Sequence, residues 1–155
     1  MPLPAGLVHA PIHGSPDTTL AEAAQKMREH GIGSLFLVDD DGRLVGVVTD
    51  RDLALRGLTQ RLDPASTPVS RVMTSEVYAL SADDELVRAS SLIRRHRIRR
   101  LPILDADRRL TGVITADDLL AHVARALSQA AECTVTGRAK ERAPVDSNRS
   151  LFGKE

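Results

Sequence analysis

The sequence contains one segment twice. Residues 15–53 align with residues 81–119 at a constant offset of 66 and without a gap, and 17 of the 39 pairs are identical. The identical pairs include Leu20/Leu86, His30/His96, Leu35/Leu101, Gly46/Gly112, Thr49/Thr115 and Asp52/Asp118. Two copies are too few for a solenoid, so the repeat predicts two similar halves that pair about a pseudo-two-fold axis. Such an axis creates a cleft between like surfaces, and we expect the functional site there.

Composition narrows the class of protein. A chain of 155 residues with 42% hydrophobic content suits one domain, or two half-domains that share a core. Aromatic residues make up only 2%, so the core is expected to be aliphatic, and base-stacking platforms are scarce. Zero net charge argues against attraction to nucleic acid or to an anionic membrane. The single cysteine, Cys133, cannot form an internal disulfide and favours the cytoplasm, and we expect neither an export signal nor a membrane span.

Each copy predicts the order helix, strand, strand, helix, with a short extended segment in front. In the first copy, apolar residues from Leu20 to Met27 recur with helical spacing, and Thr19 with Glu22 forms a capping box. Strands follow at 35–38 and 44–48, joined by the Asp41-Gly42 turn signal, and a second helix runs from 49 toward 57. The second copy repeats this plan with a helix from 86, strands at 101–104 and 110–114, and a longer last helix.

These patterns predict an α+β fold of two pseudo-symmetric repeats, each with a small mixed sheet flanked by helices. Repeat 1 is assigned to 8–58, a linker to 59–71 and repeat 2 to 72–127. The extended segments 12–14 and 77–80 are expected to add an edge strand to each sheet. A polar C-terminal tail is expected over 128–155, flexible and disordered from 136.

The segments Gly46–Leu53 and Gly112–Leu119 resemble the glycine–apolar–Ser/Thr–x–x–Asp signature of the CBS (cystathionine β-synthase) domain. The stretch Leu101–Asp105 and the Val72-Met73-Thr74 that opens the second copy are also typical of that family. In detail the chain is similar to small stand-alone CBS-pair proteins of actinobacteria. The resemblance implies a tandem CBS pair that binds an adenine nucleotide (AMP, ADP or ATP) as a regulatory ligand, as in energy sensing. It also implies a homodimer that acts on a regulated partner which the sequence does not identify.

The paired Thr-x-x-Asp motifs are the first candidate site. Thr49 with Asp52, and Thr115 with Asp118, stand where a strand runs into a helix, and a plain capping box explains a lone motif of this kind. The motif occurs twice at equivalent positions, and capping does not exclude binding. A carboxylate repels phosphate but accepts hydrogen bonds from the two hydroxyls of a ribose. We therefore expect these four residues to bind ribose, the role that the resemblance also assigns to them.

Phosphate needs cations, and here the two copies differ. The second copy carries Arg94, Arg95, Arg97, Arg99 and Arg100 within seven residues, where the first has Arg28, Glu29, Gly31, Gly33 and Ser34. Arg99 and Arg100, with Arg51 from the first signature, are the expected phosphate ligands. The other three arginines are explained by a solvated helix end. Asp117 replaces Arg51 in the second copy, so we predict one good nucleotide site and one weak or empty site per chain.

The remaining candidates are weaker. Groups of a leading segment are expected to hold the base, with either Val77, Tyr78 and Ala79 or Ile12 and His13 as candidates, and Pro102 is a further base-binding candidate. No metal site is predicted, because Pro11 separates His9 from His13 and prevents a shared helix face. No convincing catalytic set is present, so we expect no enzyme. Two alternatives remain: a CBS-pair interaction or structural protein without a nucleotide, and nucleic-acid binding through the arginines of 94–100.

Overall fold

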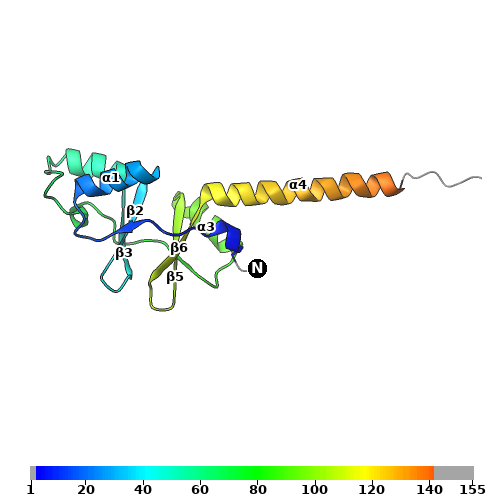
Figure 1. The fold of residues 1–155 in the computed structure, drawn as a ribbon, viewed down its shortest axis with the longest axis horizontal. Helices are drawn as coiled ribbons and strands as arrows, with labels where there is room; N and C mark the ends of the chain where they lie inside the picture. The colour runs from blue at the N-terminus through cyan, green and yellow to red at the C-terminus, as the bar shows by residue number, and fades with distance from the viewer. Residues whose placement is uncertain (1–2, 142–155) are drawn as a thin grey trace, which may run out of the picture. The chain divides into compact units, whose positions relative to one another are not determined.

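The computed structural model describes residues 3–141, which fall into two units, 3–119 and 120–141. The first unit holds both repeats (Figure 1). Repeat 1 contains β1 (His13–Gly14), α1 (Leu20–His30), β2 (Ser34–Val38), β3 (Leu44–Thr49), α2 (Asp50–Asp52) and the π-helix η2 (Leu53–Leu58). Repeat 2 contains β4 (Leu80–Ser81), α3 (Leu86–His96), β5 (Arg100–Leu104), β6 (Leu110–Thr115) and the start of α4 (Ala116–Glu141). Two short 3-10 helices, η1 (Ala5–Leu7) and η3 (Val69–Arg71), precede the repeats.

The two sheets have the same mixed topology, which confirms the predicted α+β pair. In each sheet a short first strand lies parallel to the second, and the second pairs antiparallel with the third. The registers match at the offset of 66, since Ser34 pairs with Thr49 and Arg100 pairs with Thr115. The edge strands are shorter than expected, and in repeat 2 the strand begins only at Leu80.

Local signals explain most element boundaries. Thr19 and Glu22 form the predicted capping box of α1, and Gly31 ends that helix with a left-handed φ of 61°. The helix expected over 49–57 is instead one α-turn that continues as η2. The tips of the two hairpins lie side by side (Figure 1), where the Leu44 amide donates to the Arg108 carbonyl at 3.1 Å.

Each repeat is crossed by the segment that precedes the other repeat. Val47 of β3 pairs with Thr74, and Val113 of β6 pairs with His9, through two backbone hydrogen bonds of 2.9–3.0 Å each. The signature glycines stand next to these crossings. A Cβ at Gly46 would lie 2.8 Å from the Met73 sulfur, and one at Gly112 would lie 2.6 Å from Val8 Cγ1. Glycine is therefore needed at both positions, because the crossing segment approaches the strand too closely for a side chain.

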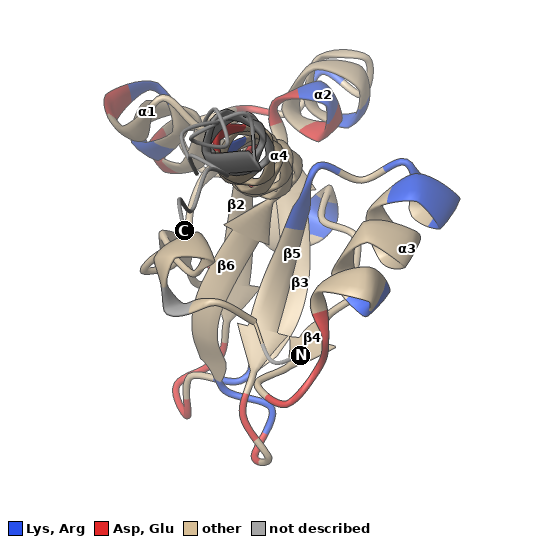
Figure 2. Cartoon of the chain, turned by 90° about the vertical axis from the view of Figure 1, so that its right-hand side faces the viewer, with Lys and Arg blue, Asp and Glu red and all other residues tan. Residues whose placement is uncertain are grey.

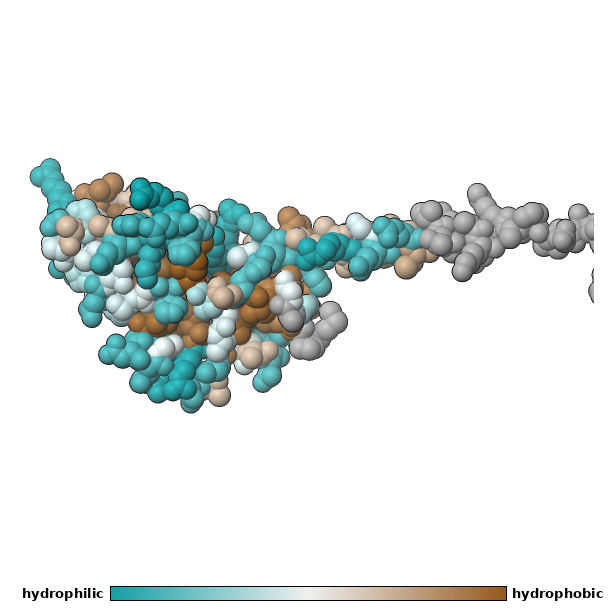
Figure 3. All heavy atoms as spheres, in the orientation of Figure 1, coloured by the Kyte–Doolittle hydropathy of each residue, from teal (hydrophilic) through white to brown (hydrophobic). Residues whose placement is uncertain are grey.

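The core consists of two aliphatic clusters, one in each repeat, as the composition predicts. Residues such as Leu35, Leu37 and Val48 are fully buried in repeat 1, and Leu101 and Ile114 are fully buried in repeat 2. Figure 3 shows that some hydrophobic side chains also reach the surface of the repeat body. Leu58 is 71% exposed and Val87 is 75% exposed.

Two less regular segments of the sequence are packed or helical in the structure. The segment between the repeats packs on repeat 1: Val69 is buried in its core, and the Leu20 amide donates to the Thr67 carbonyl at 3.0 Å. Residues 128–141, the first part of the expected polar tail, lie in helix α4. That helix extends because 116–141 contains no glycine before 137 and no proline. Residues 142–155 lie outside the described part of the chain.

Candidate functional site

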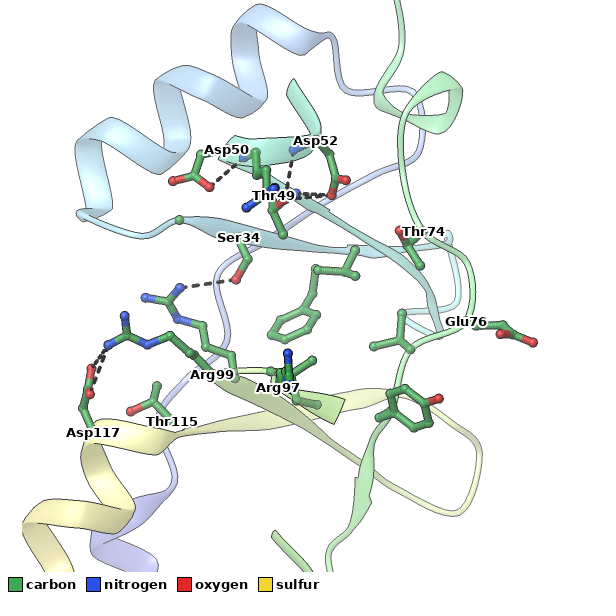
Figure 4. A pocket seen from close by; sticks show the side chains of 18 residues that line it. Ser34, Thr49, Asp50, Asp52, Thr74, Glu76, Arg97, Arg99, Thr115 and Asp117 are labelled. Carbon is green, nitrogen blue, oxygen red and sulfur yellow. Dashed lines mark hydrogen bonds and ion pairs between the residues drawn. The ribbon is translucent and has the colours of Figure 1, made fainter. Parts of the chain in front are cut away.

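A cavity of about 740 Å³ lies between the two repeats (Figure 4). Repeat 1 contributes the start of β2 and the β3–α2 junction, and repeat 2 contributes the α3–β5 loop and the β6–α4 junction. The segment 74–78 forms a further wall. The cavity is lined by Gly33, Ser34, Phe36, Val47, Thr49, Asp50, Arg51, Asp52, Thr74, Glu76, Val77, Tyr78, Arg97, Ile98, Arg99, Arg100, Thr115 and Asp117.

Asp52 is held in place by Thr49, with which it forms a complete capping box. The Thr49 amide and hydroxyl donate to Asp52 Oδ2 at 3.0 and 2.8 Å, and the Asp52 amide donates back to Thr49 Oγ1 at 3.0 Å. The other oxygen, Oδ1, lies 3.6 Å from Arg56 Nε, which is longer than a good hydrogen bond. A carboxylate has several lone-pair sites, so Oδ1 retains capacity for a further donor.

Four arginines line the cavity, and their surroundings differ. Arg99 Nη2 lies 3.2 Å from both carboxylate oxygens of Asp117, with both side chains more than three-quarters exposed. Arg100 Nη1 donates to Ser34 Oγ at 3.4 Å, a long contact across the pseudo-two-fold axis, since these two residues are each other's counterparts. Among residues 3–141 the side chains of Arg51 and Arg97 have no ion pair or hydrogen bond with another side chain. Figure 2 shows how basic residues gather at the end of α3 and in the loop that follows.

Arg97 is a cavity residue that the sequence reasoning assigned to a solvated helix end. It ends α3 with φ of 54°, in the left-handed conformation that its counterpart Gly31 adopts at the end of α1. This conformation costs a non-glycine residue about 1 kcal/mol or more. The sequence signal for Arg97 was its alignment with Gly31, the C-cap glycine of α1. Glycine is the favoured residue in a left-handed C-cap, so an arginine at this position indicates a role other than ending the helix.

One wall of the cavity is apolar and contains an aromatic pair. Phe36, Val47 and Val77 line it together with Tyr78. The Tyr78 ring stacks on His96, with centroids 3.5 Å apart and planes 21° from parallel. His96 therefore orients Tyr78, a contact that the sequence reasoning did not foresee. Such a wall offers a flat apolar surface next to the charged end of the cavity.

The structure brings most, but not all, of the predicted site residues together. Thr49, Asp52, Thr115, Arg51, Arg99, Arg100, Val77 and Tyr78 line the cavity, whereas Asp118, Ile12, His13, Ala79 and Pro102 do not. For Ile12 and His13 the crossing of the two leading segments is the reason. The segment before repeat 2 runs along β3, next to Asp52, whereas the segment before repeat 1 runs along β6. The predicted base-binding residues were thus drawn from two different places.

Asp118 has a partner of its own. Its Oδ2 accepts hydrogen bonds from the Thr115 amide and hydroxyl, as in repeat 1, but its Oδ1 lies 3.0 Å from His9 Nε2. Partial burial raises the pKa of Asp118, but the hydrogen bonds from Thr115 and His9 outweigh that effect, and the pKa is lowered overall. The carboxylate is therefore ionised and engaged within the chain.

The charges that line the cavity balance. Arg51, Arg97, Arg99 and Arg100 are matched in number by Asp50, Asp52, Glu76 and Asp117. Their positions differ, because Asp117 lies beside Arg99, whereas Glu76 lies at the far end of the cavity near Thr74 (Figure 4). The cavity therefore has a polar end with both signs of charge and an apolar end at Val77 and Tyr78.

Known proteins match this chain over both repeats. The sequence model of the CBS domain matches residues 8–57 and 69–125. CBS domain-containing protein YhcV of Bacillus subtilis is 43% identical over 105 residues, which cover 68% of this chain and 73% of that protein. Hypoxic response protein 1 of Mycobacterium tuberculosis is 36% identical over 105 residues, with the same two coverages. The chain spans only 56% of a Methanopyrus kandleri relative, to which it is 38% identical over 109 residues.

Solved structures agree with the sequence matches. The CBS domain pair of protein MJ0100, in complex with 5'-methylthioadenosine and S-adenosyl-L-methionine, superposes with a TM-score of 0.70 at 26% identity. The match covers 80% of this chain and 96% of that one. Hypoxic Response Protein I with two coordinated zinc ions superposes with a TM-score of 0.66 at 34% identity, covering 74% of this chain and 92% of that one.

These matches define the class of protein, a pair of CBS repeats that acts as a regulatory module. This chain belongs to the CBS domain family. A match to inosine-5'-monophosphate dehydrogenase of Mycobacterium bovis, 40% identical over 117 residues, covers 75% of this chain but only 21% of that enzyme. Within the described residues there is no group of three or more His, Cys, Asp or Glu side chains placed to hold a metal ion. A search of the same residues finds no helix with the length and apolarity that crossing a membrane requires.

Proposed function

We propose that this chain is a non-enzymatic sensor that binds an adenosine nucleotide in the cavity between its repeats. Asp52, oriented by Thr49, accepts hydrogen bonds from the ribose hydroxyls. Arg99 and Arg100, with Arg51, bind the phosphate, and the base lies against Val77 and Tyr78. Arg97 adds a fourth cation at the same end.

The observation that carries this proposal is that one cavity contains all three kinds of group that a nucleotide needs. A fixed carboxylate from repeat 1, guanidinium groups from repeat 2 and an apolar wall surround the same space. Its volume of about 740 Å³ lies within the usual range for small-molecule sites, about 300–1,000 Å³. The MJ0100 pair, which holds two adenosyl compounds, supports adenosine as the recognised unit.

A ligand in this position would touch both repeats and so report to a partner. Asp52 belongs to repeat 1 and Arg99 to repeat 2, so binding favours the relative orientation of the repeats that satisfies both ends of the ligand. A switch of this kind requires only that the ligand bind two orientations with different affinity. The partner protein that reads the change would be a separate chain in the cytoplasm.

The surface of repeat 1 supports a homodimer. An apolar groove of about 360 Å³ lies between α1 and η2, lined by residues that include Leu20, Ala24, Met27, Leu53 and Leu58. Leu58 is largely exposed there. A second copy would bury this surface, and sedimentation equilibrium measures the mass directly.

Isothermal titration calorimetry with AMP, ADP, ATP, NAD and S-adenosylmethionine tests the binding proposal. Asp52→Asn should weaken the best ligand by about 10- to 150-fold, because one or more charge-assisted hydrogen bonds of about 1.5–3 kcal/mol are lost. Asp118→Asn is the matched control, since it removes the same charge from an equivalent capping box outside the cavity. Equal losses in both variants, or tight binding that depends on Asp118 alone, would contradict the proposal.

One observation favours the alternative of a CBS-pair interaction protein without a nucleotide. Asp117 already neutralises Arg99 and brings an acid to the phosphate end of the cavity. If none of the five compounds binds and none raises the melting temperature, this alternative stands. Retention on nucleic acid at low salt would instead point to the basic residues of the α3–β5 loop.

A further inference from the structure

The two signature aspartates have the same backbone setting but different second partners. Both Asp52 and Asp118 close a capping box through Oδ2. The nearest cation to Asp52 Oδ1 is Arg56 at 3.6 Å, whereas Asp118 Oδ1 is in contact with His9 Nε2 at 3.0 Å. The oxygen that we assign to ribose in repeat 1 is therefore already occupied in repeat 2, by a side chain of the same protein.

His9 is fixed by its backbone and not only by this contact. Its amide and carbonyl both pair with Val113 of β6, at 2.9 and 3.0 Å. Val8 packs directly over Gly112, where a Cβ would lie only 2.6 Å away. The equivalent strand position in repeat 1, opposite Val47, is held by Thr74, a smaller side chain that lines the open cavity.

The sequence positions that correspond to the walls of the Asp52 cavity are alike only in part. At the offset of 66, the apolar wall residues Phe36, Val47 and Tyr78 correspond to Pro102, Val113 and Ile12. The cations do not repeat, because Arg99 and Arg100 correspond to Gly33 and Ser34. A ligand at Asp118 would thus find a ribose acceptor and apolar groups, but no counterpart of the arginines that bind phosphate.

We propose that His9 closes a second, latent nucleoside position at Asp118 by taking the place of the ribose hydroxyls. The position suits an uncharged adenosine-type nucleoside and not a nucleotide. It becomes available only when the segment that carries His9 leaves β6. This inference rests on the proposed function, because it assigns to Asp118 the role proposed for Asp52.

The test is His9→Thr, which places in repeat 2 the residue type that stands at the open position of repeat 1. Calorimetry with adenosine as the probe, at saturating AMP, should show no heat of binding for the natural protein and one additional equivalent for His9→Thr. The added site should disappear in His9→Thr combined with Asp118→Asn. His9→Gln retains a donor for Asp118 and should stay closed, and His30→Thr, on the exposed end of α1, controls for loss of a histidine elsewhere.

Three results would overturn the inference. The first is that the natural protein already binds a second equivalent through Asp118. The second is that His9→Thr binds AMP at Asp52 and nothing more, a result that leaves the proposed function intact. If neither protein binds AMP or adenosine, both proposals fail together. If His9→Thr does not fold, NMR of the natural protein tests the inference. AMP should shift the ring signals of Tyr78 and leave those of His9 unchanged. Displacement of His9 by AMP would refute the closure of the Asp118 position by His9.

Discussion

The ion pair between Arg99 and Asp117 bears directly on the proposed binding of phosphate in the cavity. Arg99 Nη2 lies 3.2 Å from each Asp117 oxygen, at the start of the strand and helix that border the cavity. A phosphate group has to compete with this carboxylate for the same guanidinium. We therefore predict that Asp117→Asn strengthens nucleotide binding, although it removes a charged residue from the site.

The size of the gain follows from the exposure of the pair. Both side chains are more than three-quarters exposed, and exposed ion pairs contribute about 0.2–1 kcal/mol. Loss of the acid also removes its repulsion of the ligand, which is about 1 kcal/mol for two unit charges 4 Å apart in water. Together these effects give about 1.2–2 kcal/mol, or an increase in affinity of about 8- to 30-fold.

The assay compares AMP, ATP and adenosine by calorimetry at fixed ionic strength. ATP should gain more than AMP, because it carries more negative charge, and adenosine should gain nothing. Asp107→Asn is the matched control, since Asp107 forms an exposed ion pair with Arg109 at 2.9 Å on the β5–β6 hairpin, outside the cavity. Weaker AMP binding by Asp117→Asn, or an equal gain for adenosine, would refute the reasoning.

Three further predictions concern stability. Gly46→Ala and Gly112→Ala should each lower the free energy of unfolding by about 1–3 kcal/mol in urea titrations, because their Cβ atoms would overlap the crossing segments. Gly6→Ala, with open space around it, is the control. An unchanged free energy of unfolding in Gly112→Ala would contradict the close approach of Val8. Arg97→Gly should stabilise the fold by about 1 kcal/mol, by removing a left-handed arginine, while it weakens AMP binding; a destabilised variant would contradict the strain argument. The lowered pKa of Asp118 means that its contribution to stability is present above the pKa of an unfolded aspartate, about 3.9, and is lost as pH falls through the lower folded value. The difference in unfolding free energy between the natural protein and Asp118→Asn should therefore shrink between pH 6 and pH 3, and a constant difference would rule out this linkage.

The repeat made the fold predictable from the sequence. Identical residues at a constant offset imply the same local structure twice, so a clear signal in one copy supports a weak one in the other. The hairpin turn at Asp107-Arg108 is an example: arginine is a poor turn residue, yet Arg108 adopts a φ of 64° beside the 79° of its counterpart Gly42. Asp105, like Asp39, accepts two backbone amides of its own turn, which compensates for the unfavourable residue.

Which residues line the cavity was less predictable, because this depends on which segment crosses which sheet. Periodicity and capping signals describe one repeat at a time and do not say that Thr74 pairs with Val47 of the other repeat. Val77 and Tyr78, which line the cavity with Asp52, were therefore named only in a set of candidates that also held Ile12 and His13. His9 was considered only as a metal ligand, since no local pattern connects it with an aspartate 109 positions away.

Some of the differences between the repeats fall on residues that line the cavity. Glycine or serine at 31, 33 and 34 becomes arginine at 97, 99 and 100, whereas the Thr-x-x-Asp capping box is kept in both repeats. A symmetric cavity would bind two small ligands equally or a symmetric ligand once. Three of the four cavity arginines lie on the loop between α3 and β5, and of the two signature aspartates only Asp52 lines the cavity, so its two sides are unlike. A ligand with a flat apolar end, a diol and an anionic end satisfies these two sides only in one orientation, and it must then contact both repeats at once.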